Sequence, residues 1–188
     1  MAQAARPYHH GDLPRALIAA ALELVEEDGP ASLSLREVAR RAGVSHGAPA
    51  HHFGDKAGLL TAVATDGHEL LASSLAEVFE RTGDFREVGV GYVRFALDHR
   101  AHFEVMFRPE LLHADDPTLV AARERAAAML YGPPAELTGD PAVEGAVAAW
   151  SLMHGFATLW LTGNLGEVVP GDPEDAARAI TEFLRLSR

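Results

Sequence analysis

The 188-residue sequence contains no cysteine and only one lysine. Without cysteine the chain forms no disulfides, thiolate nucleophiles or cysteine-ligated metal sites. No apolar run approaches the ~18–20 residues of a membrane span. The N-terminal stretch "MAQAARPYHHGDLP" also lacks the apolar segment of a signal peptide. We therefore expect a cytoplasmic protein without a membrane partner.

Positive charge is also scarce, since the formal net charge is −11. This value argues against nucleic acid coating the whole surface. The charges are unevenly distributed, however. Residues 1–67 carry six basic and eight acidic side chains, whereas residues 68–188 carry ten and nineteen. Residues 34–56 have a net charge of +2, so the N-terminal part remains a candidate for contact with nucleic acid.

Strand-like alternation is nearly absent, and helical periodicity recurs along the chain. Residues 12–29 place apolar side chains on one helical stripe that ends at Asp28-Gly29. Asp-Pro pairs at 116–117, 140–141 and 172–173 match the preferred first positions of helices. They predict helices at about 117–131, 141–163 and 173–187, with a Gly/Pro-rich loop at 131–140. The sequence thus predicts an all-α fold of about nine helices.

Residues 34–53 have the pattern of a helix, a short turn and a second helix. Ser34 and Glu37 have the spacing of a capping box. Ala39 is small enough for close helix crossing, and Gly43 suits the positive φ of a turn. Ser45 is predicted to cap the second helix. The segment therefore predicts a helix-turn-helix, whose second helix enters the major groove of DNA.

Pro49 leaves the start of that second helix open between two alternatives. If Ser45 is the N-cap, Pro49 falls at the fourth position and forfeits the first backbone hydrogen bond. If the cap lies one or two residues later, Pro49 falls within the first turn, where proline costs little. The helix is short in either case.

The stretch "HGDLPRALIAAALELVEEDGPASLSLREVARRAGVSHGAPAHHFGDKAGLL" resembles the N-terminal domain of TetR-family transcriptional regulators over residues 8–65. The stretch "AWSLMHGFATLWLTG" at 149–163 resembles the family's Trp-His-Gly subgroup, through Trp150, His154 and Gly155. The resemblance implies a three-helix DNA-binding head at 8–56 and a regulatory and dimerisation body at 57–188. It also implies a homodimeric repressor that binds a pseudo-palindromic operator in double-stranded DNA and is released by a small-molecule effector.

The resemblance further implies which residues contact DNA. Carried over position by position, they are Ser34, Arg36, Ser45, His46, Gly47, Ala48, Ala50, His51, His52 and Lys56. The family usually has tyrosine where this chain has Ala50, so a phosphate contact is missing at that position.

Two further residue sets follow from the resemblance. The predicted effector pocket contains Phe95, His99, Phe103, Met106, Phe107, Met129, Trp150, Met153, His154 and Trp160. The predicted dimer interface on the last two helices contains Trp150, Ala157, Leu161, Ala176, Ile180, Phe183 and Leu184. A two-fold operator requires a two-fold protein, which is why dimerisation belongs to this interpretation.

Two alternatives remain at this point. The chain could be a helical ligand- or metal-binding protein that has lost operator binding. Ala50, in place of the family's usual tyrosine, is the residue that favours this alternative. His99, His102 and His154 are the residues that a metal site would use, although histidines at this spacing are commonly surface residues. An enzyme is disfavoured, because no nucleophile–base pair, phosphate loop or carboxylate pair stands out. We expect no cofactor and no bound metal.

Overall fold

A computed structural model describes residues 13–138, 142–165 and 168–182. Its described residues form nine α-helices and one 3-10 helix and no strand, which confirms the all-α prediction. The helices are α1 (Leu13–Asp28), α2 (Leu35–Arg41), α3 (Ala48–Phe53), α4 (Lys56–Thr82), α5 (Phe85–Asp98), α6 (Arg100–Met106), α7 (Pro117–Thr138), α8 (Ala142–Leu161) and α9 (Pro173–Thr181), with η1 (Pro109–Leu111) between α6 and α7.

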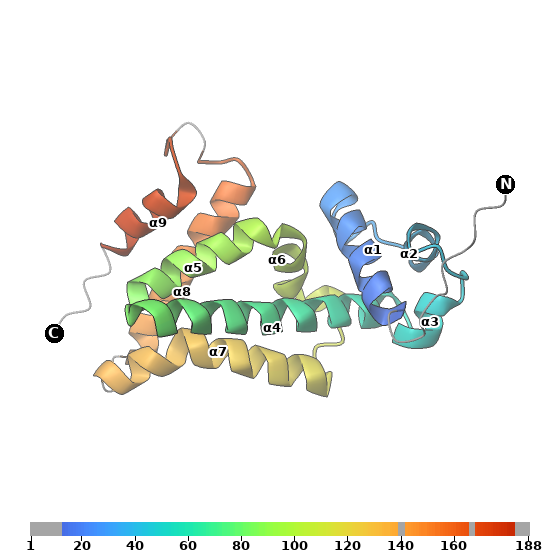
Figure 1. The fold of residues 1–188 in the computed structure, drawn as a ribbon, viewed down its shortest axis with the longest axis horizontal. Coiled ribbons are helices and arrows are strands. Elements are labelled where there is room, and N and C mark those ends of the chain that lie inside the picture. The colour runs from blue at the N-terminus through green and yellow to red at the C-terminus, as the bar shows by residue number, and fades with distance from the viewer. Residues whose placement is uncertain (1–12, 139–141, 166–167, 183–188) are drawn as a thin grey trace.

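The molecule is elongated, and α4 runs along most of its length (Figure 1). Helices α1, α2 and α3 gather around the N-terminal end of α4 and form the head. Helices α5 to α9 surround the rest of α4 and form the body, with α7 lying alongside α4 (Figure 1). No helix of the described residues is both long and apolar enough to cross a membrane.

Local capping chemistry sets several helix ends where the sequence places them. Asp55 accepts a hydrogen bond from the Gly58 N–H at 2.8 Å and begins α4, and Gly83 ends α4 with a φ of +63°. Asp172 accepts hydrogen bonds from the N–H groups of Glu174 and Asp175 and begins α9. Side-chain acceptors satisfy N–H groups that a helix start leaves free, which is why these ends could be predicted locally.

The predicted loop at 131–140 is wrong, because α7 continues to Thr138. Proline inside a helix loses a backbone hydrogen bond and crowds the carbonyl four residues before it, but this cost does not end α7 at the Gly/Pro-rich segment. The third predicted helix, 173–187, is seen as α9 up to Thr181, and residues 183–188 lie outside the described part.

Helix α4 packs closely against α6 in the middle of the molecule. A Cβ added at Gly67 would lie 2.6 Å from the Met106 Sδ, so the two helices come close together at a position where α4 has no side chain. The His102 Nε2 lies 3.0 Å from the Asp66 Oδ2 across the same pair of helices. This packing connects the body to the element that carries the head.

Candidate nucleic-acid interface and ligand cavity

The start of α2 is fixed by a side-chain cap and an apolar pair. The Ser34 Oγ accepts a hydrogen bond from the Glu37 N–H at 3.3 Å, which is half of the predicted capping box. The Glu37 carboxylate instead accepts from the Arg40 Nε at 2.9 Å. Leu33 and Val38, on either side of the cap, are both buried in the core. The cap and this apolar pair together set the direction in which α2 leaves the preceding turn.

The turn between α2 and α3 has the geometry that its residues predict. Gly43 has a φ of +68°, a conformation that side chains with a Cβ rarely adopt. Ala39 is completely buried, and its carbonyl accepts a hydrogen bond from the Val44 N–H at 3.0 Å. Val44 is half-buried and packs on the core. The turn therefore holds α2 and α3 as a helix-turn-helix.

The cap of the short helix α3 is Gly47, so the prediction that Ser45 caps it is wrong. The Gly47 carbonyl accepts the first helical hydrogen bond, from the His51 N–H at 2.9 Å. Pro49 then lies in the first turn, where its missing N–H is not needed, and its ring is buried. Of the two alternatives that the sequence leaves open, the later cap is correct.

Helix α3 is held against α4 through a contact that sequence reasoning missed. Phe53 is half-buried and packs on the core, and Gly54 ends α3 with a φ of +79°. In the first turn of α4, a Cβ added at Gly58 would lie 1.9 Å from the Phe53 carbonyl oxygen. Only glycine fits there, so Gly58 sets how closely α3 approaches α4. The only sign of this contact in the sequence is that a glycine stands near the start of a helix, where the local backbone does not need one.

The residues predicted to contact DNA lie at the start of α2, in the turn, on α3 and, in the case of Lys56, at the start of α4. All of them are exposed except Ala48 and Lys56, which are half-buried. Most of the set is thus accessible to a partner molecule. We call the set the head surface: Ser34, Arg36, Ser45, His46, Gly47, Ala48, Ala50, His51, His52 and Lys56.

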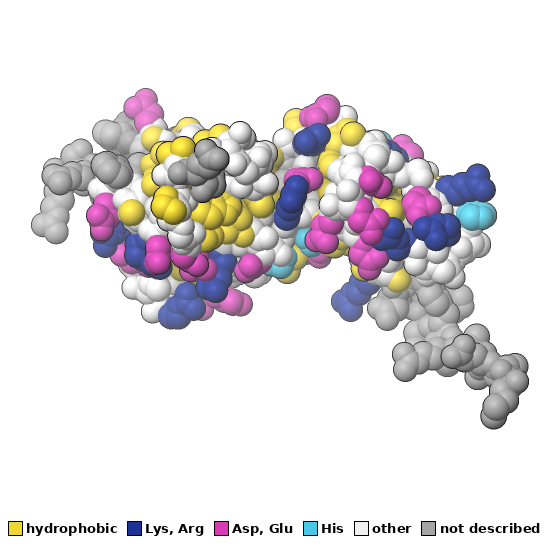
Figure 2. Space-filling view, turned by 90° about the horizontal axis from the view of Figure 1, so that it is seen from above, with side chains coloured by type: hydrophobic (Ala, Val, Ile, Leu, Met, Phe, Trp, Pro, Cys, Tyr) yellow, Lys and Arg dark blue, Asp and Glu magenta, His cyan; other side chains and the backbone are white. Residues whose placement is uncertain are grey.

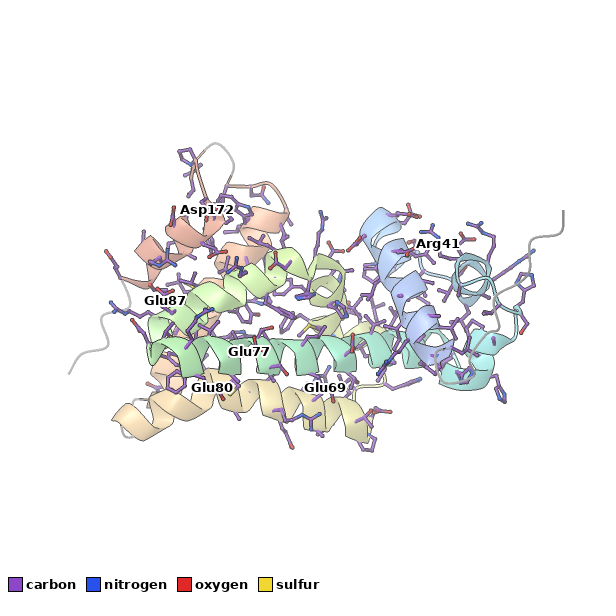
Figure 3. The ribbon with its side chains drawn as sticks, in the orientation of Figure 1. Arg41, Glu69, Glu77, Glu80, Glu87 and Asp172 are labelled. Atoms are coloured by element: carbon purple, nitrogen blue, oxygen red, sulfur yellow. The ribbon has the colours of Figure 1, made fainter. Side chains whose placement is uncertain are left out.

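Most of the head's cations already have partners within the chain. The Arg41 guanidinium binds Glu27 at 2.7 Å and Glu23 at 3.3 Å (Arg41 is labelled in Figure 3), and this pairing lowers the pKa of Glu27. The Lys56 Nζ donates to the Ala31 carbonyl at 2.6 Å. Lysine, arginine and acidic side chains are accordingly mixed over the head (Figure 2).

Arg36 differs from these cations. It is exposed and has no ion-pair partner among the residues that the structure describes. Its guanidinium is therefore the cation of the head surface that can meet a phosphate without breaking an internal contact.

The body contains a cavity of about 360 Å³ between α4, α6, α7 and α8. Three residues of the predicted pocket line it, namely Met106, Phe107 and Trp150. The other lining residues were not predicted from the sequence. They are His68, Leu71, Pro109, Arg123, Ala126, Ala127, Leu130 and Tyr131.

His68 is the most unusual of these lining residues. Its side chain is 6% exposed, and neither ring nitrogen has a hydrogen-bond partner among the described residues. Burial lowers the pKa of His68 to about 4, and the nearby charge of Arg123 acts in the same direction. The polar backbone of Met106 acts in the opposite direction and raises the pKa of His68 by less than burial lowers it. The imidazole is therefore neutral at neutral pH.

The position of His68 on the apolar stripe of α4 could have marked it in the sequence. Histidines in such positions are more often core residues, however, so the pattern alone does not indicate a ligand site.

The other predicted pocket residues have different surroundings. Phe103 and His154 pack behind the cavity wall, with ring centroids 5.1 Å and 4.6 Å from Phe107. The His154 Nδ1 lies 2.8 Å from the Tyr92 hydroxyl, and burial lowers the pKa of His154. A smaller apolar cavity, of about 60 Å³, is lined by Met153 together with Trp150.

Four predicted pocket residues lie away from these two cavities. Phe95 and His99 line a polar groove of about 200 Å³ between α4 and α5. Met129 and Trp160 are half-buried and pack against the core. For these four, helical spacing identified an apolar face but not the side on which a cavity lies.

Helix α8 presents an apolar face to solvent. Val147, Leu152 and Leu159 are 43%, 37% and 45% exposed and lie on one side of the helix. Hydrophobic side chains gather on the half of the molecule that carries α8 and α9 (Figure 2). We call these three residues and Gly155, which lies between them, the α8 face.

The predicted interface residues lie partly elsewhere. Ala157 is completely buried within its own chain, which corrects its assignment to a surface for a partner. Trp150, Leu161, Ala176 and Ile180 are half-buried against the core. Phe183 and Leu184 lie outside the described residues.

The histidines considered for a metal site have separate partners. His102 binds Asp66, and His154 binds Tyr92. In the described part of the chain, no three His, Asp or Glu side chains are grouped in a way that could hold a metal ion.

Comparisons with known proteins place this geometry among bacterial regulators. Residues 17–63 match the family model for bacterial regulatory proteins of the tetR family, and residues 85–184 match the tetracyclin repressor-like C-terminal domain. The first match covers the helix-turn-helix, and the second covers most of the body. Similarity to the Trp-His-Gly subgroup stays a prediction.

A curated relative, the HTH-type transcriptional regulator BetI of Ectopseudomonas mendocina (strain ymp), is 43% identical over 93 residues. The match covers 48% of this chain and 40% of that protein, so it spans less than half of the relative's length.

Solved structures match over nearly the whole chain. A protein of unknown function from Rhodococcus sp. RHA1 has a TM-score of 0.80 and 31% identity, with 96% of this chain and 97% of that chain covered. The TetR family transcriptional regulator PfmR of Thermus thermophilus has a TM-score of 0.66 and 20% identity, with 92% and 99% covered, and supports the fold.

Proposed function

The chain belongs to the TetR family of transcriptional regulators, and we propose that it is a homodimeric repressor that binds an operator through its head surface and releases it when a small molecule enters the body cavity. We place the boundary between the two functions as the sequence predicts it, with a DNA-binding domain at 8–56 and a regulatory and dimerisation domain at 57–188. The observation that carries the proposal is the exposed α3, fixed on one side by the turn at Gly43 and on the other by Gly58.

Contact with DNA follows from the chemistry of the head surface. Most protein–DNA hydrogen bonds go to phosphate and sugar, and hydroxyl and backbone N–H groups can make them. Ser34 and Ser45 supply hydroxyls, and Gly47 and Ala48 let α3 approach the base edges closely. The surface has few free cations, so recognition depends on shape and neutral hydrogen bonds more than on charge.

Dimerisation is supported by the α8 face. Val147, Leu152 and Leu159 each leave more than a third of their area exposed to water instead of packing into the core of the chain. Grouped exposed apolar side chains of this kind mark interaction surfaces. A Cβ added at Gly155 meets nothing within 4 Å, so the glycine has open space beside it in the single chain. A second copy that packs α8 against α8 would bury this face and produce the two-fold axis that a palindromic operator requires.

Control by an effector is supported by the position of the cavity. The cavity is lined by residues of α4, and α4 also carries the contact between Gly58 and α3. A ligand shifts the protein between conformations only by the difference in its affinity for them. An effector that favours a different packing of α4 would therefore change the position of α3.

Selection of DNA by the full-length protein from random duplexes tests this function. We expect the enriched duplex to have two related half-sites and to give a gel shift. If no duplex is enriched by folded, dimeric protein, the proposal fails. The chain is then the helical ligand-binding protein without operator binding that the sequence left open.

A pair of arginine substitutions tests the dimer. Leu159→Arg adds a charge to the α8 face and is expected to yield monomers that no longer shift the operator, as measured by analytical ultracentrifugation and gel shift. Val120→Arg is the matched control, because Val120 is also exposed, at 38%, but lies on α7. A Leu159→Arg protein that remains dimeric contradicts the proposed interface.

A further inference from the structure

The body cavity contains polar groups that its protein surroundings leave unsatisfied. His68 offers one donor and one acceptor when neutral, and both ring nitrogens lack partners among the described residues. The Trp150 Nε1 is likewise buried without a partner there. A buried polar atom without a hydrogen bond is destabilising, and native proteins rarely keep one. These nitrogens have almost no accessible surface, so they make part of the cavity wall polar, but a ligand in the cavity as it stands does not reach them.

The cavity also has one charged lining residue, Arg123. The Arg123 Nη1 donates to the Ala114 carbonyl at a long 3.3 Å, and no described carboxylate forms an ion pair with it. Arg125, two residues along α7, contrasts with it, because its Nη2 binds the Glu69 carboxylate at 2.7 Å on the surface (Glu69 is labelled in Figure 3). In a chain with a net charge of −11, a half-buried arginine without an acidic partner is unusual.

The rest of the lining is apolar, and much of it is aromatic. Phe107, Tyr131 and Trp150 supply flat rings, with Tyr131 and Trp150 at 83° to each other and 6.2 Å apart. The volume of about 360 Å³ lies within the range of pockets that hold small organic molecules. Such walls bury a hydrophobic body, while the polar groups fix its orientation.

We propose that this cavity binds an apolar carboxylic acid, with Arg123 holding the carboxylate and the aromatic wall covering the hydrophobic body. The proposal rests on the proposed function and deepens it, because it names the chemical class of the effector. Arginine is the side chain whose planar donors match a carboxylate best. An anion there would give Arg123 the acidic partner that the described residues do not supply.

Calorimetric titration of the full-length protein at pH 7.5 tests the proposal with three matched pairs of probes. The pairs are 2-naphthylacetate, 4-biphenylacetate and decanoate, each beside its uncharged amide. We expect at least one carboxylate to bind, and to bind about ten- to a hundredfold more tightly than its amide, since charged hydrogen bonds are the stronger ones. Arg123→Gln is expected to remove this preference and leave amide binding unchanged. Arg125→Gln, on the same helix, is expected to keep the preference.

Three results would overturn the proposal. They are the absence of binding by every carboxylate, equal binding of acid and amide, and a preference that survives Arg123→Gln. Thermal unfolding of both variants, together with their amide binding, verifies that the cavity is intact. A gel shift in the same samples separates this proposal from the proposed function. Operator binding without a carboxylate preference refutes the ligand class alone, and a carboxylate preference without operator binding refutes the regulator.

Discussion

Replacing His68 with leucine is expected to stabilise the protein at neutral pH and to remove part of its sensitivity to acid. The native imidazole is 6% exposed and leaves both nitrogens without partners in the described structure. Leucine has a similar volume and no polar atoms. At pH 7.5 the substitution is therefore expected to raise the free energy of unfolding by about 1–3 kcal/mol.

The acid sensitivity follows from the pKa of His68. Burial lowers this pKa from 6.5 in an exposed histidine to about 4 in the folded protein. Between these values the unfolded chain binds a proton that the folded chain does not, so stability falls as the pH falls. The contribution is fully present above pH 6.5, and about 1.4 kcal/mol of it is lost for each pH unit between pH 6.5 and the folded-state pKa of about 4. Between pH 6.5 and pH 5, the wild type should lose about 2 kcal/mol more than His68→Leu.

Urea unfolding at fixed protein concentration, at pH 7.5, 6.5 and 5, measures both effects. His102 and His154 also have a pKa lowered by burial, but both remain in the variant, so the difference between the two proteins isolates His68. Arg123→Gln is a second control, since burial rather than Arg123 is the larger cause and most of the pH dependence should persist. Parallel stability curves for wild type and His68→Leu from pH 7.5 to 5 would mean that His68 does not take up a proton on unfolding in this range.

Three further substitutions test other parts of the structure. Gly58→Ala puts a Cβ 1.9 Å from the Phe53 carbonyl and should lower stability by about 1–3 kcal/mol and weaken operator binding in anisotropy titrations. Gly132→Ala, where a Cβ meets nothing within 4 Å, should do neither, and equal effects would contradict the packing argument. Arg36→Gln should reduce the slope of log K against log salt by about 1, and an unchanged slope would mean that Arg36 contacts no phosphate. Asp172→Ala removes the cap of α9 and should lower the free energy of unfolding by about 1 kcal/mol, and unchanged urea curves would mean that the cap adds nothing.

Features that depend on neighbouring residues were predictable from the sequence. The caps at Asp55 and Asp172 and the turn at Gly43 each need only a few residues, so the helix ends and the helix-turn-helix could be placed. The start of α3 was harder, because Ser45 is also a good cap. Pro49 favours the later start, since it fits the first turn without losing a backbone hydrogen bond.

Features that depend on tertiary packing were not predictable. His68 and Arg123 are 55 positions apart and meet only because α7 lies along α4. Helix α8 carries apolar residues on several sides, so periodicity alone did not tell the buried Ala157 from the exposed Leu159. The same limit explains why several predicted pocket residues line no part of the larger cavity.

A hydroxyl-radical footprint of the wild-type protein on DNA upstream of its own gene shows directly whether the head surface reads an operator. We expect two protected patches related by a two-fold axis, with centres separated by one helical turn of about 34 Å or a multiple of it. Protection should disappear for Leu159→Arg and persist for Val120→Arg. Uniform protection, a single patch, or no protection by folded dimer would contradict the claim that this head surface reads an operator.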